Sequence, residues 1–440
     1  MKNKKWMAIL LGGIMAASLA APCSVSAAEK TTLTFWHAMG GTNGEVLQQI
    51  VDDFNASQDE IEIKAEYQGT YDDTITKLKA AMQSDSGLPD VCQMYDVGTK
   101  FMYDSGAVIP VEDKFESTGY DKSSVMEVIS SYYTVDGKQY AMPFNVSTPM
   151  LYYNKDVFEA AGLDPETPPT TYDEVLEDAK KIVDSGAAPV GYSQAIYGWF
   201  FEQQLAGLGV TYGNNDNGRK EAVTAVDFDS NGGGLKVFDM WKKLYDSGCF
   251  EDYGTTTADT QTAFFSGQVG MIIESTAILK NAVDSSPFEV GTGYLPRIEQ
   301  NDEGGVIIGG GSLWLTDTGN EANEDAGWKF IEYITTPDVQ AKWSMGTGYF
   351  AINEKAYETD DMKAYLKENP NFETAINQLK DSPVNCNTAG VLSGVQTEAR
   401  LTFNEIMPQV YDGKLTTQDA VDQLAASVNK AIENYNESIK

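Results

Sequence analysis

The 440-residue chain is strongly acidic, with 65 Asp and Glu residues against 31 Lys and Arg residues and a formal net charge of −34. A surface of this charge repels nucleic acid and anionic lipid, and no basic patch interrupts it, so nucleic-acid binding is excluded. The chain is also too long for a single hydrophobic core, and we expect two domains.

The N-terminus has the features of an export signal. Three lysines lie within the first five residues, an apolar run covers residues 6–21, and small residues follow. Val25 and Ala27 fit the −3 and −1 positions of a cleavage site, which predicts a signal peptide at residues 1–27. Because the apolar run is shorter than the ~20 residues of a bilayer span, we expect an exported, soluble protein in a periplasm.

Cys23 leaves one alternative open, a lipid anchor that would hold the protein at the cell surface. A lipoprotein signal usually has a small residue before its cysteine, and here that residue is Pro22. After cleavage only Cys92, Cys249 and Cys386 remain. Their odd number and wide spacing match neither a disulfide framework nor a metal site, so we interpret them as buried apolar residues.

The first hundred residues alternate between strand and helix patterns. Strands separated by helices of this length predict an α/β fold with a parallel sheet. The predicted strands cover 32–36, 61–67 and 89–95, and the predicted helices cover 45–56 and the stretch that carries Ile75, Leu78 and Met82.

Two later segments have clear helical signatures. Thr171 can cap a helix while Glu174 reaches back to it, and apolar residues follow at helical spacing. A second helix is predicted near the C-terminus by apolar residues four apart between 420 and 432. The chain contains no internal repeat and no long linker, which indicates that its domains are joined by short crossings within ordered structure.

Motifs for catalysis are missing from the sequence. The only histidine is His37, and no nucleophile elbow, Walker loop or dinucleotide fingerprint is present. The glycine run at 309–311 lacks the lysine of a phosphate-binding loop. We therefore predict no enzyme, no cofactor and no metal, and interpret His37 as a lining or packing residue.

Three segments instead suggest a binding site for a small polar molecule. Tyrosine, tryptophan, serine and glycine gather at residues 67–71, 192–199 and 347–349. Aromatic platforms next to hydroxyls and bare backbone amides suit such a ligand. The same aromatic residues also suit a hydrophobic core. Composition and pattern alone therefore indicate no more than an exported two-domain protein that binds a ligand.

Several longer segments resemble the family-1 extracellular solute-binding proteins of ABC importers, and in particular the members of that family that bind sn-glycerol-3-phosphate. The resemblance covers the whole mature chain in order. The segments that carry it are FWHAMGG at 35–41, YDVGT at 95–99, PFNVSTPMLYYNKD at 143–156, AGLDP at 161–165, IIGGGSLW at 307–314 and TGY at 347–349.

The resemblance implies a periplasmic-binding-protein-like type II fold, in which two lobes are joined by a multi-crossing hinge. Lobe one is expected at 29–144 plus 306–352, and lobe two at 145–305 plus 353–440. The implied function is capture of sn-glycerol-3-phosphate between the lobes and its delivery to the transmembrane permease of an ABC importer. We expect the protein to act as a monomer.

The resemblance also implies a set of ligand-binding residues. Arg400, one of three arginines, is expected to hold the phosphate through two parallel hydrogen bonds. Asp96 is expected at the glycerol end, where the family has the longer glutamate, so its contact with the hydroxyls would run through water. The full set is Tyr71, Asp96, Ser147, Trp199, Ser275, Gly310, Tyr349 and Arg400.

Two alternative functions remain at this point. The first is the same transport role with a glycerophosphodiester, such as glycerophosphocholine, or a neutral oligosaccharide as the ligand; a sugar would need more stacking aromatics and no arginine. The second is a secreted hydrolase of polysaccharides or phosphodiesters. A glycerophosphodiesterase usually needs metal ligands, which a chain with one histidine does not readily supply.

Overall fold

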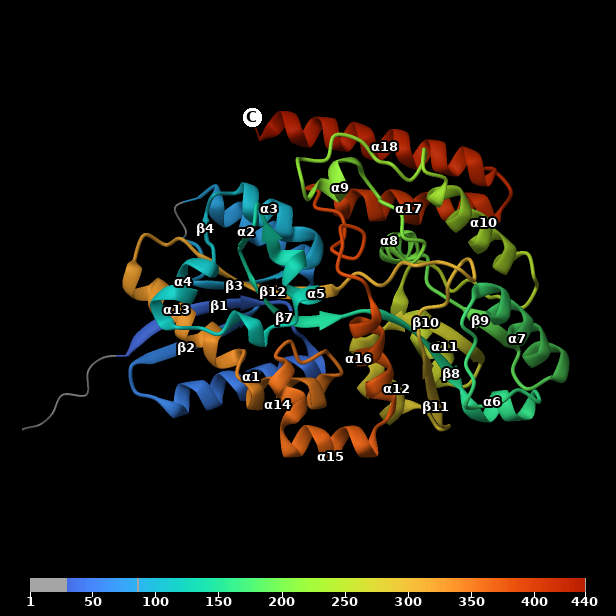
Figure 1. Ribbon diagram of the computed structural model, residues 1–440, viewed down its shortest axis with the longest axis horizontal. Helices are drawn as coiled ribbons and strands as arrows, with labels where there is room; N and C mark the ends of the chain where they lie inside the picture. The colour runs from blue at the N-terminus through green and yellow to red at the C-terminus, as the bar shows by residue number, and fades with distance from the viewer. Residues whose placement is uncertain (1–29, 85–86, 440) are drawn as a thin grey trace, which may run out of the picture.

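Two β-sheets, each flanked by helices, form the two lobes that lie side by side in Figure 1. The structure is a computed structural model that describes residues 30–84 and 87–439. The predicted signal peptide at 1–27 and the alternative anchor at Cys23 lie outside the described residues. Within those residues, no helix combines the length and apolarity needed to cross a bilayer. The α/β fold class agrees with the prediction.

A six-stranded sheet forms the centre of the first lobe. Its order is β2-β1-β3-β12-β4, and β7 also pairs with β12. Strand β1 is parallel to both β2 and β3, which confirms the predicted parallel sheet. Strand β12 comes from far along the chain and runs antiparallel to its neighbours. The strands are β1 (Thr31–His37), β2 (Ile61–Tyr67), β3 (Val91–Tyr95), β4 (Val108–Ile109), β7 (Met142–Ser147) and β12 (Gly309–Thr316).

Helices cover this sheet because each has one apolar face. The helix predicted at 45–56 is confirmed as α1 and begins four residues earlier; it buries Leu47, Ile50, Val51 and Phe54. The helices of the first lobe are α1 (Gly41–Ser57), α2 (Tyr71–Met82), α3 (Thr99–Asp104), α4 (Glu112–Thr118), α5 (Glu127–Ser130), α13 (Glu321–Ile334), α14 (Pro337–Thr347) and α15 (Asp360–Glu368).

A four-stranded sheet forms the centre of the second lobe, in the order β11-β8-β10-β9. Its strands are β8 (Pro149–Asn154), β9 (Val190–Ser193), β10 (Val269–Ser275) and β11 (Val290–Gly293). The predicted capping box at Thr171 and Glu174 is confirmed at the start of α7. The helices are α6 (Lys155–Ala160), α7 (Tyr172–Ser185), α8 (Gly198–Gly207), α9 (Asn214–Gly218), α10 (Gly233–Tyr245), α11 (Thr257–Phe265), α12 (Leu279–Ser285), α16 (Asn371–Asp381), α17 (Gln396–Tyr411) and α18 (Thr417–Ser438).

The chain passes between the two sheets at defined places. Thr148 alone separates β7 from β8, and residues 294–308 connect β11 back to β12. The expected boundary at 144/145 falls inside β7, and the one at 352/353 falls before η5 (Glu354–Glu358). Both η5 and α15 pack on α14 of the first lobe, whereas α16 packs on β11 of the second. The division into lobes stays a proposal, with these passages as its structural basis.

The C-terminal helix α18 lies along α17 and reaches over the first lobe in Figure 1. Near its end, the Tyr435 hydroxyl donates a hydrogen bond to Asp104 of α3, with 2.7 Å between the oxygens. A capping box at Thr416 and Asp419 begins this helix. The capping residue therefore helps to set the helix that holds α17 in place.

We predict that Thr416→Ala lowers the free energy of unfolding by about 1 kcal/mol, because the Asp419 amide loses its hydrogen-bond acceptor at the helix start. Urea denaturation measures the change. Thr402→Ala is the matched control, since its hydroxyl bonds only the carbonyl one turn earlier within α17. The control is expected to change stability by less than about 0.5 kcal/mol, and equal losses in both variants would contradict the prediction.

Candidate functional site

A buried cluster of three charges lies where the lobes meet. The Arg400 guanidinium donates from Nε and Nη2 to the two Glu202 oxygens, each at 2.7 Å. Nη2 also donates to Asp96 Oδ2 at 2.7 Å. All three side chains are only 7% exposed. Arg400 and Glu202 belong to α17 and α8 of the second lobe, while Asp96 begins η1 (Asp96–Gly98) of the first, so the cluster joins the two lobes.

The electrostatics of this cluster follow from burial and pairing. Burial alone would lower the pKa of Arg400, but the charges of Asp96 and Glu202 outweigh it and raise that pKa well above the ordinary value. Burial raises the pKa of Glu202, and the charge and hydrogen bonds of Arg400 offset this only in part. One cation between two carboxylates leaves the cluster with a formal charge of −1.

Sequence analysis predicted Arg400 and Asp96 but missed Glu202. Glu202 follows Trp199 by three residues and therefore lies on the same face of α8. Gln396, one turn before Arg400 on α17, donates to Glu202 Oε1 at 3.0 Å. Helical spacing from the predicted Trp199 was the available signal for Glu202, but no local pattern shows which arginine it pairs with.

Two predicted tyrosines meet on the first-lobe side. The Tyr71 hydroxyl accepts a hydrogen bond from Asn145 Nδ2 at 2.7 Å and also interacts with the Tyr349 hydroxyl. Burial raises the pKa of Tyr71 well above its ordinary value, so the hydroxyl stays neutral. Its ring stacks on Tyr95 with centroids 5.2 Å apart. Asn145, which receives a further bond from Gln93, is a second residue that sequence analysis missed.

The glycine run of β12 permits two close backbone contacts. Gly310 has φ +91°, and a Cβ at this position would lie 1.9 Å from the Asn145 carbonyl oxygen, so any side chain would clash. A Cβ at Gly309 would lie 2.8 Å from the Trp199 indole, which therefore packs directly on bare backbone. The absence of side chains thus brings β7, β12 and α8 together at one point.

Both predicted serines lie close to the passage at Thr148. Ser147 ends β7 and pairs with Gly309, while Ser275 ends β10 and pairs with Pro149. The Ser275 hydroxyl accepts a hydrogen bond from the Ala277 amide at 3.2 Å, which caps η4 (Thr276–Ile278). The structure therefore brings all eight predicted residues to the junction of the lobes; their contact with a ligand stays a prediction.

Three polar groups in this region keep hydrogen-bonding capacity. Within the described residues, Ser147 Oγ, Trp199 Nε1 and Arg400 Nη1 form no hydrogen bond, whereas Arg400 Nε and Nη2 are fully used. Their side chains come from both lobes. Among the described residues, no group of three or more His, Cys, Asp or Glu is placed to hold a metal ion. The available chemistry is therefore hydrogen bonding to a polar solute.

His37 lies outside this cluster, at the end of β1. Its Nδ1 accepts a hydrogen bond from the Met39 amide at 3.3 Å, and its ring packs beside Phe35 and Tyr67. This arrangement agrees with the interpretation of His37 as a packing residue.

Comparison with known proteins identifies the family. The family described as bacterial extracellular solute-binding protein matches residues 49–374. The sn-glycerol-3-phosphate-binding periplasmic protein UgpB of Escherichia coli (strain K12) is 31% identical over 417 residues, covering 93% of this chain and 94% of that protein.

Two solved structures share the fold. UgpB from Mycobacterium tuberculosis, in complex with glycerophosphocholine, has a TM-score of 0.79 at 20% identity and covers 92% of this chain and 99% of its own. The cyclic alpha-maltosyl-1,6-maltose binding protein from Arthrobacter globiformis has a TM-score of 0.76 at 26% identity, and the match covers 92% of this chain and 100% of that protein. The expected fold of periplasmic binding proteins is confirmed.

The chain belongs to the bacterial extracellular solute-binding protein family. It is the solute-binding component of an ABC importer, a transport receptor and not an enzyme. The prediction of a non-catalytic binding protein is thereby confirmed, and the hydrolase alternative is set aside.

We predict that Glu202→Gln lowers the free energy of unfolding by about 3–5 kcal/mol, because it leaves buried Arg400 with one carboxylate and turns an amide toward its N–H groups. Urea denaturation at pH 7 measures the loss. Glu398→Gln, on the exposed face of α17, removes the same charge and is expected to cost less than about 0.5 kcal/mol. A loss from Glu202→Gln as small as that of this control would contradict the prediction.

A second prediction concerns pH. Burial lowers the pKa of His37 from 6.5 to about 4. The unfolded state therefore binds more protons between these values, so the free energy of unfolding falls as pH decreases from about 6.5 to about 4. We expect this contribution to reach about 2 kcal/mol after solvent screening.

Comparison with His37→Gln isolates this contribution, because the variant lacks the titrating group while its carboxylates titrate as before. As pH falls, the free energy of unfolding is expected to decrease more for the wild type than for the variant. NMR titration of the single imidazole gives the pKa directly, and a value near 6.5 would contradict the burial argument.

Proposed function

We propose that this receptor captures sn-glycerol-3-phosphate between its lobes and delivers it to the transmembrane permease of its importer. The observation that carries the proposal is buried Arg400, whose Nη1 group has no hydrogen-bond partner among the described residues. The 31% identity over 93% of the chain to a protein named for this ligand supports it.

The geometry suggests how the ligand would be held. Glu202 engages Nε and one edge of Nη2, which orients the guanidinium and leaves the Nη1 edge for phosphate oxygens. Ser147 Oγ and Trp199 Nε1 add neutral donors nearby. Phosphate would compete with Asp96 for Nη2, and a displaced Asp96 would accept hydrogen bonds from the glycerol hydroxyls.

A second ligand class is supported by the charge of the cluster. Two carboxylates already neutralise Arg400, and the resulting net charge of −1 opposes a phosphate dianion but tolerates a neutral polyol. Trp199 and the stacked pair of Tyr71 and Tyr95 offer aromatic faces to a sugar ring. A neutral oligosaccharide is therefore the alternative ligand. The phosphate of a glycerophosphodiester carries one negative charge fewer than that of the monoester, so its electrostatic repulsion by the cluster is intermediate.

We further propose that the mature protein acts as a monomer in a periplasm after removal of residues 1–27. Attachment to the cell surface through Cys23 is the alternative. Mass spectrometry of the protein purified from its host distinguishes these, because cleavage after Ala27 and lipidation at Cys23 leave N-termini of different mass.

Calorimetric titration of the mature protein with sn-glycerol-3-phosphate, glycerophosphocholine and maltose tests the ligand. Glycerol-3-phosphate is expected to bind most tightly. Stronger binding of the diester or of maltose would keep the transport role and replace the ligand. An absence of heat with all three would reject the proposed ligand class.

Arg400→Lys tests the arginine itself. Lysine keeps the charge but lacks the planar fork, so affinity for glycerol-3-phosphate is expected to fall roughly 10- to 100-fold. Arg297→Lys is the control, since Arg297 lies outside the three-charge cluster, and it is expected to leave this affinity unchanged. Equal affinities of the Arg400→Lys variant and the wild type would remove Arg400 from the site.

A further inference from the structure

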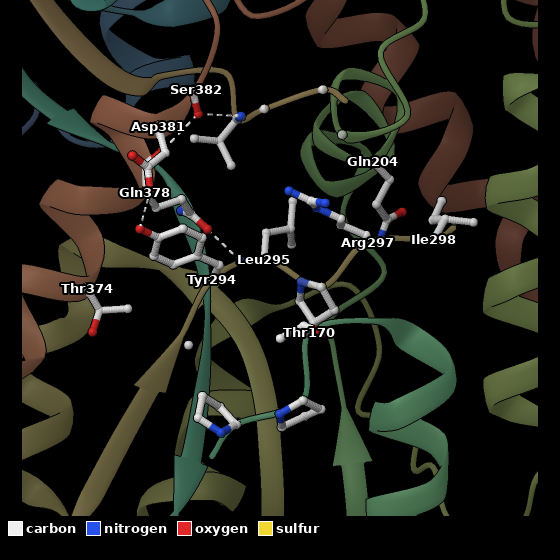
Figure 2. A pocket seen from close by; sticks show the side chains of 18 of the residues that line it. Thr170, Gln204, Tyr294, Leu295, Arg297, Ile298, Thr374, Gln378, Asp381 and Ser382 are labelled. Atoms are coloured by element: carbon white, nitrogen blue, oxygen red, sulfur yellow. Dashed lines mark hydrogen bonds between the residues drawn. The ribbon is translucent and has the colours of Figure 1, made fainter. Parts of the chain in front are cut away.

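A separate pocket of about 610 Å³ lies beside the passage between β11 and β12 (Figure 2). Its volume falls within the range of small-molecule sites. It is lined by the loop before α7, the C-terminal half of α8, the end of β11, the passage itself and one face of α16. None of the eight predicted solute-binding residues lines it.

The walls of this pocket are held by hydrogen bonds. The Leu295 amide donates to Gln378 Oε1 at 2.5 Å, and Gln378 Nε2 donates to the Pro149 carbonyl at 2.7 Å. The Val306 amide donates to Ser382 Oγ at 3.1 Å. These bonds join the passage, α16 and β8, so the pocket is formed before any ligand arrives.

Arg297 lies within this pocket and has no partner for its charge. Its backbone is fixed to the opposite wall, because its amide donates to Thr170 and its carbonyl accepts from Tyr172, both at 2.9 Å. Its guanidinium forms no hydrogen bond or ion pair among the described residues. Figure 2 shows it between Gln204 on one side and Gln378 and Asp381 on the other.

Arg297 is an exposed residue, so water solvates its guanidinium and an anion can reach it from outside. The other two arginines already have partners: Arg400 pairs with two carboxylates through Nε and Nη2, and Arg219 donates to the carbonyls of Tyr132, Ala389 and Gly390. Arg297 is thus the arginine whose whole guanidinium, within the described residues, is open to an external anion.

The rest of the lining is largely apolar around Arg297. Pro168, Pro169, Leu295 and Ile298 contribute hydrocarbon surface. At the α16 side, Asp381 accepts a hydrogen bond from the Tyr294 hydroxyl at 2.8 Å and keeps further acceptor capacity. The pocket therefore combines one cation, an apolar body and a distant acceptor.

We propose that this pocket is a second binding site, for an amphipathic organic anion that carries a carboxylate or sulfonate on an apolar ring. The anionic group pairs with Arg297, and the ring lies against the prolines and Leu295. The negative charge of the surrounding surface does not prevent this, since fields beyond roughly 8–10 Å are screened at physiological salt. The site is independent of which solute binds at Arg400.

Fluorescence titration with 1-anilinonaphthalene-8-sulfonate tests the proposal, because this probe has a sulfonate and apolar rings. The mature wild-type protein is titrated while saturated with its solute. If no solute has been found, the unliganded protein is titrated instead. We expect saturable binding with one site per chain. Arg297→Gln is expected to weaken it at least tenfold, and Thr374→Trp, which fills the pocket, to abolish it.

Lys180→Gln is the matched control, since it removes one exposed positive charge on α7 outside the pocket. It is expected to leave probe binding unchanged, while Asp381→Asn is expected to strengthen it several-fold by removing the opposing charge. Thermal unfolding of each variant checks that the fold is retained.

Three outcomes would overturn the proposal: no saturable binding to the wild type, equal binding to the Arg297→Gln variant, or equal weakening by Lys180→Gln. Displacement of the probe by the Arg400 ligand in direct competition would also overturn it, because the probe would then occupy the solute site. The first three outcomes do not depend on the identity of the transported solute, and none of the four tests solute binding at Arg400, so failure here leaves the proposed function intact.

Discussion

The pairing of buried Arg400 with two carboxylates is the constraint on which the junction of the lobes depends. A buried cation without partners would be strongly destabilising, so the guanidinium requires Glu202 and Asp96 in place. Glu202 shares the second lobe with Arg400, whereas Asp96 belongs to the first. The same interaction that neutralises the arginine therefore joins the lobes, and a solute that competes for Asp96 acts directly on that connection.

Close backbone packing complements this charge cluster. Gly309 and Gly310 let Trp199 and the Asn145 carbonyl approach β12 at distances that no side chain would allow. A single residue, Thr148, separates the strands of the two sheets at this point. Short connections and missing side chains place residues from both lobes within hydrogen-bonding reach of one another, which is the geometry a small solute needs.

The three arginines of this acidic protein have three different surroundings. Arg400 is paired with carboxylates, whereas Arg219 is surrounded by carbonyls and the Tyr132 ring, and its burial lowers its pKa to about 10. Arg297 is exposed at the pocket beside the passage between β11 and β12, and its guanidinium has no ion-pair partner among the described residues. The proposed solute site and the proposed second site thus rest on different arginines, with α8 contributing Trp199 and Glu202 to the first and Gln204 to the second.

Local patterns in the sequence determined the secondary-structure elements. Apolar residues at every second position predicted β2, apolar residues at helical spacing predicted α1, and the Thr171 capping box predicted the start of α7. The resemblance to a known family placed Asp96 and Arg400 in one site. Only the tertiary structure revealed Glu202 as the main partner of Arg400, the insertion of β12 beside β3, and the pocket around Arg297. These depend on residues about 76 to 224 positions apart, and no short-range periodicity encodes which distant side chains meet.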